Sequence, residues 1–405
     1  MSETTVPRGT RVRLGAVDGD LRVEPEARID ADPRTVVSGS VRFEGRARVS
    51  GDLECGSFRS ERGRVEIDGA LTVREDLHAA DGEVEVAGAL RARRVDVDRR
   101  LRVGGPAVAE EFEVGGVLDG GSTLQATKVS VGGRFRLAGR LTAASVEAGG
   151  SVELADVDVE SLEAGGMIEL GGGIVRRSID VGGRFVSVAA LEFGDLDVGG
   201  IAEFREAAKG GAIHVGGMLT ARADLGFTSL TIGGMGAIRG DARGDLIEVG
   251  GKFDVRGSLE LTGSLSVGGL ISVDGPVSGE SLEVGGKFQA RRAIFRASAE
   301  IGGAVTTREG LRASRLRLRR RSRATGPLVG GTVELEERAR AEEIFGDSVD
   351  LGERAEARRI VARRVRLRER SKVHEVTYTD SVELGEDVEL GAPPLKVTDL
   401  PSFPL

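Results

Sequence analysis

One short phrase returns along this sequence at a nearly constant interval. In SIDVGGRFVSVAALEFGDLDVGG, residues 178–200, a valine followed by two glycines occurs at Val181 and again 17 residues later at Val198. We name the apolar residue before each glycine pair the reference residue. Reference residues occur at Val114, Val131, Ala148, Ala164, Val181, Val198, Val215, Ile232, Val249, Val267, Val284 and Ile301. The register continues without paired glycines at Leu318, Leu335, Leu351, Leu367 and Leu384. Repeats of this length predict a solenoid, in which each repeat forms one coil.

Each repeat contains apolar residues at alternate positions. The residue two before the reference residue is apolar in every repeat, as Ile179 is before Val181, and the residue between them is usually polar. A second alternating pair follows the reference residue, as Phe135 and Leu137 follow Val131. This alternation is typical of strands with one buried face. A third apolar position occurs at Leu141, Ile174, Leu191, Leu225, Leu259, Val277, Ile294 and Leu311. Three short strands per coil of 17 residues predict an all-β fold, a single-stranded parallel β-helix.

The glycine pairs lie where the first strand of a coil must turn into the second. Such a turn needs a positive φ or very close backbone stacking, and glycine permits both because it has no Cβ. A phosphate-binding glycine loop is the functional alternative. The sequence contains no Gly-Lys-Ser/Thr and no G-x-G-x-x-G segment, and no helical pattern follows the glycines. We therefore expect their role to be structural.

The repeats divide the chain into four predicted regions. Looser versions of the phrase occur at Val49, Ile67, Val86 and Val103. Only 11 residues separate Val103 from Val114, and Pro106 lies between them, so we expect the coil there to lose one side or to bulge. The predicted regions are an N-terminal β-helix subdomain (1–105), a central Gly-Gly β-helix (106–304), Arg- and Glu-rich coils (305–391) and a Pro-rich apolar tail (392–405).

Candidates for catalytic chemistry are few. The three histidines, His78, His214 and His374, are far apart in the sequence, and the single Cys55 forms no metal-ligand pattern. The chain has no Trp and one Tyr, whereas sugar-processing β-helix enzymes stack their substrates on exposed aromatic rings. We therefore predict no enzymatic activity, no catalytic or metal-binding residues and no cofactor. The first residues lack the apolar core of a signal peptide, so we expect a cytoplasmic protein.

An arginine-rich run, RASRLRLRRRSRATG at residues 312–326, has two interpretations. It could bind nucleic acid or anionic lipid. In the solenoid register, however, Arg317 lies beside Glu334 of the next coil, and that column continues with Asp350, Arg366 and Glu383. Opposite charges on neighbouring strands attract each other, and aromatic residues are missing from the run. With a net charge of −8 as well, we favour an intramolecular charge ladder and expect no nucleic acid partner.

Two groups of apolar residues are candidate contact sites. The first, three residues after the reference residue, is a predicted lateral stripe at Met167, Ile201, Met218, Met235 and Leu270. The second lies in the tail, GAPPLKVTDLPSFPL, whose prolines prevent another regular coil. The tail either folds back over the last coil as a cap or docks onto another molecule, through Leu395, Val397, Leu400, Phe403 and Leu405.

The stretch VSGSVRFEGRARVSGDLECGSFRSERGRVEIDGALTVREDLHAADGEVEVAGAL, residues 37–89, resembles the bactofilins, the polymer-forming cytoskeletal proteins. The resemblance implies a β-helix that polymerises end to end without nucleotide and serves as a cytoplasmic scaffold for cell shape or protein positioning. Its implied partners are copies of itself or a paralogous β-helix protein, with membrane-associated or cell-envelope proteins as further partners. Typical members have one short core, and this core is several times longer. A second hypothesis is therefore a non-polymerising solenoid, an adaptor or binding module that uses its long faces.

Overall fold

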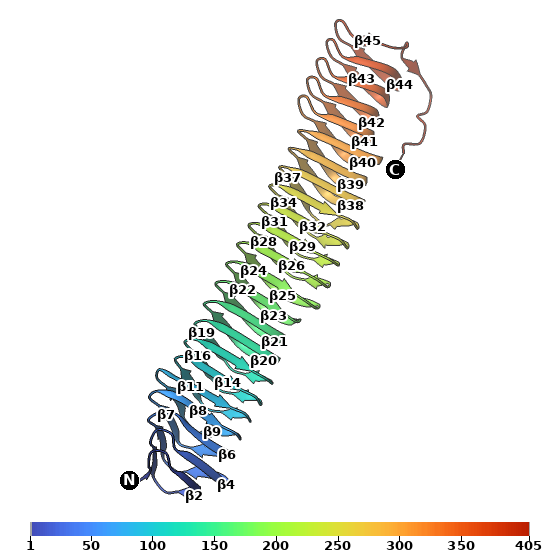
Figure 1. The fold of residues 1–405 in the computed structure, drawn as a ribbon. Coiled ribbons are helices and arrows are strands. Elements are labelled where there is room, and N and C mark those ends of the chain that lie inside the picture. The colour runs from blue at the N-terminus through green and yellow to red at the C-terminus, as the bar shows by residue number, and fades with distance from the viewer. Residues whose placement is uncertain (1, 405) are drawn as a thin grey trace. The chain divides into compact units, whose positions relative to one another are not determined.

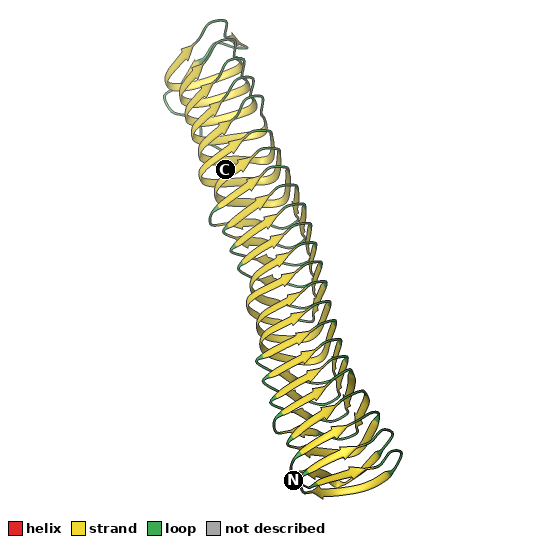
Figure 2. Cartoon of the chain, turned by 90° about the vertical axis from the view of Figure 1, so that its left-hand side faces the viewer, coloured by secondary structure: helices red, strands yellow, loops and turns green. Residues whose placement is uncertain are grey.

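The computed structural model describes residues 2–404, and these residues form strands, turns and loops but no helix (Figure 2). The chain divides into two compact units, residues 1–200 (unit 1) and residues 201–405 (unit 2). In each unit, successive coils stack through parallel strand pairs (Figure 1). The predicted all-β parallel solenoid is thus confirmed.

Unit 1 contains 25 strands among its described residues. They are β1 (Glu3–Val6), β2 (Arg11–Val17), β3 (Asp20–Val23), β4 (Arg28–Val37), β5 (Ser40–Phe43), β6 (Ala47–Cys55), β7 (Ser57–Ser60), β8 (Gly63–Ile67), β9 (Leu71–Val73), β10 (Asp76–Ala79), β11 (Gly82–Val86), β12 (Leu90–Arg91), β13 (Arg94–Val97), β14 (Arg100–Val103), β15 (Ala107–Val108), β16 (Glu111–Val114), β17 (Val117–Gly120), β18 (Leu124–Gln125), β19 (Lys128–Val131), β20 (Arg134–Ala148), β21 (Ser151–Ala164), β22 (Met167–Leu170), β23 (Gly173–Val181), β24 (Arg184–Ser187) and β25 (Leu191–Val198).

Unit 2 contains the remaining strands of the described chain. They are β26 (Ile201–Phe204), β27 (Ala208–Lys209), β28 (Ala212–Val215), β29 (Met218–Ala221), β30 (Leu225–Gly226), β31 (Ser229–Ile232), β32 (Met235–Ile238), β33 (Ala242–Gly244), β34 (Leu246–Val249), β35 (Lys252–Val255), β36 (Leu259–Leu261), β37 (Ser264–Val267), β38 (Leu270–Val284), β39 (Lys287–Ile301), β40 (Ala304–Leu318), β41 (Arg323–Leu335), β42 (Arg340–Leu351), β43 (Glu356–Leu367), β44 (Lys372–Leu384), β45 (Glu389–Leu390) and β46 (Leu395–Lys396).

Three strands make one coil, as β16, β17 and β18 show before β19 begins the next coil. Reference residues of successive coils are register partners, for example Val114 with Val131 and Val249 with Val267. The predicted inward direction is correct, because every reference residue from Val114 to Leu367 is at most 7% exposed. The core is therefore a set of parallel columns of aliphatic side chains inside the coils.

The paired glycines stack on one another and do not adopt positive φ. None of them is among the glycines with positive φ in the described chain. A Cβ built on Gly132 would lie under 3.0 Å from the carbonyl oxygen of Gly115, one coil earlier, and Gly149 meets Gly132 in the same way. The sequence predicted either a positive φ or close backbone stacking at this corner, and the structure shows close backbone stacking.

The structure overturns the interpretation of the short interval at Pro106. Val103 does not belong to the reference column, because it pairs with Val86 and Gly120 in the second strand of the coil. The other looser repeats, at Val49, Ile67 and Val86, lie in the same second-strand column. Val114 instead pairs back with Val97, which is the true reference residue there. Strand pairing runs through Pro106 without a lost side, so the expected defect near residue 105 is wrong.

Two residues of the predicted third strand also point the other way. Ile174 is 39% exposed, because Gly173 and Val175 occupy the inward positions that Val157 and Val159 hold one coil earlier. Ile294 is likewise shifted by one residue, and its neighbours Ala293 and Phe295 are buried in its place. A register shift precedes each site, between β20 and β21 after Leu137 and between β38 and β39 after Val273, and such a shift exchanges inward and outward positions.

The corner changes in the coils of unit 2 that follow residue 318. Here a four-residue turn replaces Gly-Gly, and its third residue has positive φ. These residues are Arg321, Arg338, Arg354, Arg370 and Asp387, with φ between 56° and 62°. Gly9 and Glu26 hold the same place in the first coils of unit 1, with φ of 68° and 66°. A positive φ at this place is what a type II turn requires.

Candidate interaction surfaces

The coil at the C-terminal end of unit 2 has no coil stacked on it within the described chain. Residues 381–384 of β44 pair backward with β43 and have no forward partner, and β45 pairs only with β44. As a result Leu384, a reference residue, is 51% exposed, and the inward-facing Val382, Val388 and Leu390 are only half-buried. We name these four residues the C-terminal end face. Uncovered core side chains beside an unpaired strand edge favour further pairing.

The first coil of unit 1 has a matching unpaired edge. Among residues 2–404, β1 pairs only with β3, and β2 pairs only with β4. Of the side chains on its inward positions, Thr4 is exposed and Val12 and Leu14 are half-buried, whereas Val6 is buried. Thr4, Val12 and Leu14 form the N-terminal end face. Both end faces therefore present unpaired backbone groups, and the C-terminal one also presents a large exposed apolar side chain.

The C-terminal tail folds back onto the solenoid, but it covers the side of the coils and not their end. Residues 377–378 of β44 pair with β46, after which the chain runs back beside β42 and β41 (Figure 1). Leu400 and Phe403 pack on Val329, Phe345 and Val361, which we name the flank cluster. The rings of Phe345 and Phe403 lie with centroids 5.9 Å apart.

The remaining predicted tail contacts have different surroundings. Leu395 is 60% exposed, and Val397 is half-buried and donates its backbone N–H to the Tyr378 carbonyl. Leu405 lies outside the described residues. The described part of the tail thus packs on its own unit and leaves the C-terminal end face uncovered.

The predicted lateral stripe is partly continuous. In unit 2, Ile201 pairs with Met218, and Met218 pairs with Met235. These three side chains are between 37% and 50% exposed. Lys252 interrupts the column before Leu270, which is half-buried. Met167 belongs to unit 1, where its register partners are Ser151 and Arg184.

The arginine-rich run of unit 2 forms the predicted ladder with the next coils. Arg317 pairs in register with Glu334, and their side chains approach to 3.8 Å, while Arg317 also bonds Glu336 at 2.7 Å. The column continues to Arg366 and Glu383, which are 2.7 Å apart. The predicted register of this column is therefore correct.

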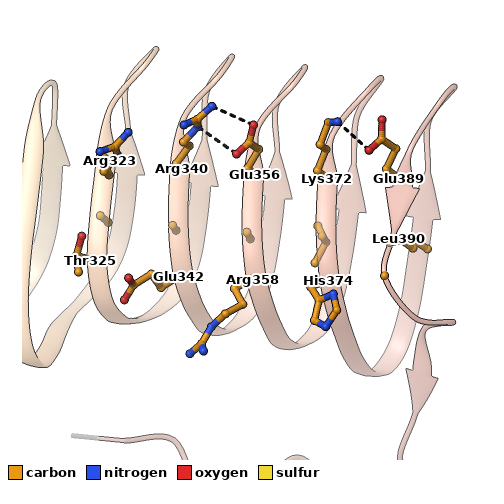
Figure 3. A pocket seen from close by; sticks show the side chains of 15 residues that line it. Arg323, Thr325, Arg340, Glu342, Glu356, Arg358, Lys372, His374, Glu389 and Leu390 are labelled. Carbon is orange, nitrogen blue, oxygen red and sulfur yellow. Dashed lines mark hydrogen bonds and ion pairs between the residues drawn. The ribbon is translucent and has the colours of Figure 1, made fainter.

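A second charge ladder crosses the next face of the same coils. Arg340 donates a hydrogen bond of 3.2 Å to Glu356 and forms an ion pair of 3.1 Å with it, and Lys372 lies 2.8 Å from Glu389 (Figure 3). The hydrogen bond that Lys372 donates to the Glu389 carboxylate raises the pKa of Lys372. These side chains line a shallow hollow of about 590 Å³. Its charges are largely paired with one another, and Arg323 at its beginning is exposed.

The side chains capable of catalysis remain separate. His78 bonds Asp96 at 2.8 Å on the surface, and His214 and His374 are exposed on other coils. Cys55 is buried in the core, where desolvation raises the pKa of its thiol to about 12, so the reactive thiolate is scarce. Among residues 2–404 no group of three or more His, Cys, Asp and Glu side chains could hold a metal ion.

Comparisons of the chain with family models, curated proteins and solved structures found no match. None of the described residues forms a helix that could cross a bilayer. The roles of the surfaces described above are therefore inferred from their geometry alone. Sequence reasoning missed the flank cluster and the C-terminal end face. For the flank cluster a signal was present, because Leu328-Val329, Ile344-Phe345 and Ile360-Val361 place apolar residues on both faces of one strand.

Proposed function

We propose that this protein is a non-enzymatic scaffold of the bactofilin type, which assembles end to end without nucleotide in the cytoplasm. The observation that carries the proposal is the C-terminal end face, where Leu384 is half exposed and residues 381–384 have no forward partner. Another coil placed there would extend the parallel ladder and bury these side chains. The resemblance of residues 37–89 to bactofilins points to the same kind of assembly.

A structural role also agrees with the rest of the surface. The glycine pairs are used for stacking, and most of the ion pairs among the described residues join neighbouring coils. Such a scaffold would support cell shape or position other proteins, including membrane-associated or cell-envelope proteins. Its filaments would contain copies of this chain or a paralogous β-helix protein.

The lateral stripe favours a second candidate function, a non-polymerising binding module. Ile201, Met218 and Met235 form three exposed apolar side chains in one column. Exposed apolar patches often mark contacts with partners. In that case the long faces of the coils would bind a partner, and the ends would stay free.

A matched pair of substitutions separates the two functions. Leu384→Asp places a charge on the C-terminal end face, and Met235→Asp places one on the lateral stripe, at nearly equal exposures of 51% and 50%. The proposal predicts that the unmodified chain and the Met235→Asp variant form filaments visible by electron microscopy, with or without ATP, whereas Leu384→Asp remains in short particles. Discrete particles of the unmodified chain at every concentration would favour the binding module.

A further inference from the structure

The two end coils share a corner geometry that the Gly-Gly coils lack. Gly9 in the first coil and Asp387 in the last are both third in a four-residue corner, with φ of 68° and 56°. In preceding coils this third residue donates its N–H to the next coil, as Arg354 does to Glu369 O at 3.0 Å and Arg370 does to Glu386 O at 2.9 Å. Within the described chain the N–H of Asp387 has no such backbone acceptor.

On this basis, and resting on the proposed end-to-end assembly, we infer that the junction is head to tail, with the N-terminal end face of one copy stacked on the C-terminal end face of another. Val6 is in the reference column of unit 1, and Leu384 is in that of unit 2. Stacking them fixes the register of the whole junction, because side chains and hydrogen bonds alternate along a strand.

In this register, the unpaired backbone groups and apolar side chains of one end face meet partners on the other. The Asp387 N–H meets the carbonyl of Arg8, which accepts no backbone hydrogen bond from the described residues of its own chain. Val12 covers Leu390, and β1 continues the sheet beyond residues 381–384. The corner of one copy thus fits the corner of the other in the way that successive coils fit within unit 2.

The charges of the two ends are complementary. Residues 380–389 contain five acidic side chains and no basic one, whereas residues 7–13 contain three arginines and no acidic residue. In the inferred register Arg8 lies over Glu386, and neither side chain forms an ion pair within the described chain. Arg11 lies over Glu389, which would extend the ladder of Figure 3. Opposite potentials favour this junction and disfavour the wrong one.

A junction between like ends lacks these features. Two C-terminal ends would bring ten carboxylates together, five from each copy, and two N-terminal ends would bring arginines together. A two-fold junction would also place the end strands antiparallel, whereas every strand pair that the structure resolves is parallel. A filament built head to tail has a direction, with different surfaces at its two ends.

Cysteine cross-linking tests the direction of the junction. Thr5 and Glu383 are exposed, and each precedes the reference position by one residue, so the inferred register places their Cα atoms about 4.8 Å apart. A Thr5→Cys chain mixed with a Glu383→Cys chain should give covalent dimers with a short bismaleimide linker. Each variant alone should give none, since Cys55 is buried. Efficient dimers from either variant alone would overturn the inference and leave end-to-end assembly standing.

A charge exchange tests the register independently. Arg8→Glu or Glu386→Arg alone should raise the critical concentration for sedimentation by about ten-fold, and the doubly exchanged chain should recover. Arg323→Glu, which makes the same charge change as Arg8→Glu at an exposed site away from both ends, should have no effect. Assembly without recovery in the doubly exchanged chain would refute the Arg8–Glu386 contact. Absence of assembly by the unmodified chain at all concentrations would instead refute the proposed function and the inference together.

Discussion

Replacing Gly286 with alanine should destabilise unit 2, whereas the same change at the adjacent Gly285 should not. The built Cβ of Gly286 lies under 3.0 Å from the carbonyl oxygen of Gly269, while that of Gly285 lies 3.5 Å from Gly268 O, an ordinary contact. Neither glycine has a positive φ, so the backbone conformation itself permits alanine at both. The two positions therefore differ only in what lies one coil below.

The magnitude follows from what must move. The Gly269 oxygen also accepts the backbone N–H of Lys287 at 2.8 Å, so a Cβ that displaces it weakens a ladder hydrogen bond. Overpacking costs about 1–3 kcal/mol and the hydrogen bond about 1 kcal/mol, which gives a loss of about 2–4 kcal/mol for Gly286→Ala. Gly285→Ala should lie between neutral and a gain of about 1 kcal/mol from the lower entropy of the unfolded chain.

Urea unfolding followed by circular dichroism measures the difference. The comparison uses the shift in midpoint between the two variants, because a solenoid need not unfold in one step. A Gly286→Ala midpoint equal to that of Gly285→Ala would refute the stacking account of the glycine pairs. Local loosening should also appear as faster amide exchange near Lys287 in the Gly286→Ala variant alone.

Three further outcomes are expected. Val249→Asp should abolish soluble expression, because an unpaired charge in the core costs about 3–5 kcal/mol. His214→Asp should be tolerated, because His214 points outward just before the reference residue of its coil, and equal tolerance of both changes would contradict the register. The hydrogen bond from Arg176 lowers the pKa of Asp158 in the folded protein. The ionised carboxylate therefore stabilises the fold at pH values above the ordinary aspartate pKa near 4, and this contribution is lost as the pH falls through the pKa of the folded state. In thermal melts from pH 6 to pH 2, the melting temperature of Asp158→Asn should fall less than that of the unmodified chain. Phe403→Ala should lower the stability of unit 2 by about 1–2 kcal/mol and release the tail to proteolysis, and an unchanged cleavage rate would contradict its packing on the flank cluster.

The period of the sequence was sufficient to predict the coils and the inward columns, because stacked coils must repeat the same alternation. The period does not distinguish the first strand from the second where both end in the same phrase, and for this reason Val103 and the three looser repeats before it belong to another column than the sequence predicts. The one-residue shifts at Ile174 and Ile294 depend on local register changes, such as the one after Leu137, that alter the repeat length by only one residue.

The candidate contact surfaces were harder to predict because they depend on where the tail goes. The prolines near residue 393 correctly indicated the end of regular coils, but no local pattern specifies the side onto which the chain then turns. Packing of Phe403 against Phe345 decides that path, and it leaves Leu384 exposed. An end face is defined by the absence of a neighbour, which a sequence period alone does not reveal.

The glycine corners also bear on how such a protein can evolve. A side chain added at one corner contacts the backbone of the preceding coil, so a single substitution there clashes unless that coil changes as well. Coils that begin after Val215, Ile232 and Val249, by contrast, present closely similar corners to both neighbours. Duplication or loss of one whole repeat therefore preserves every interface, and each such event changes the length of unit 2 by about 4.8 Å. Selection can adjust the length of this unit in single-coil steps more readily than it can alter one corner.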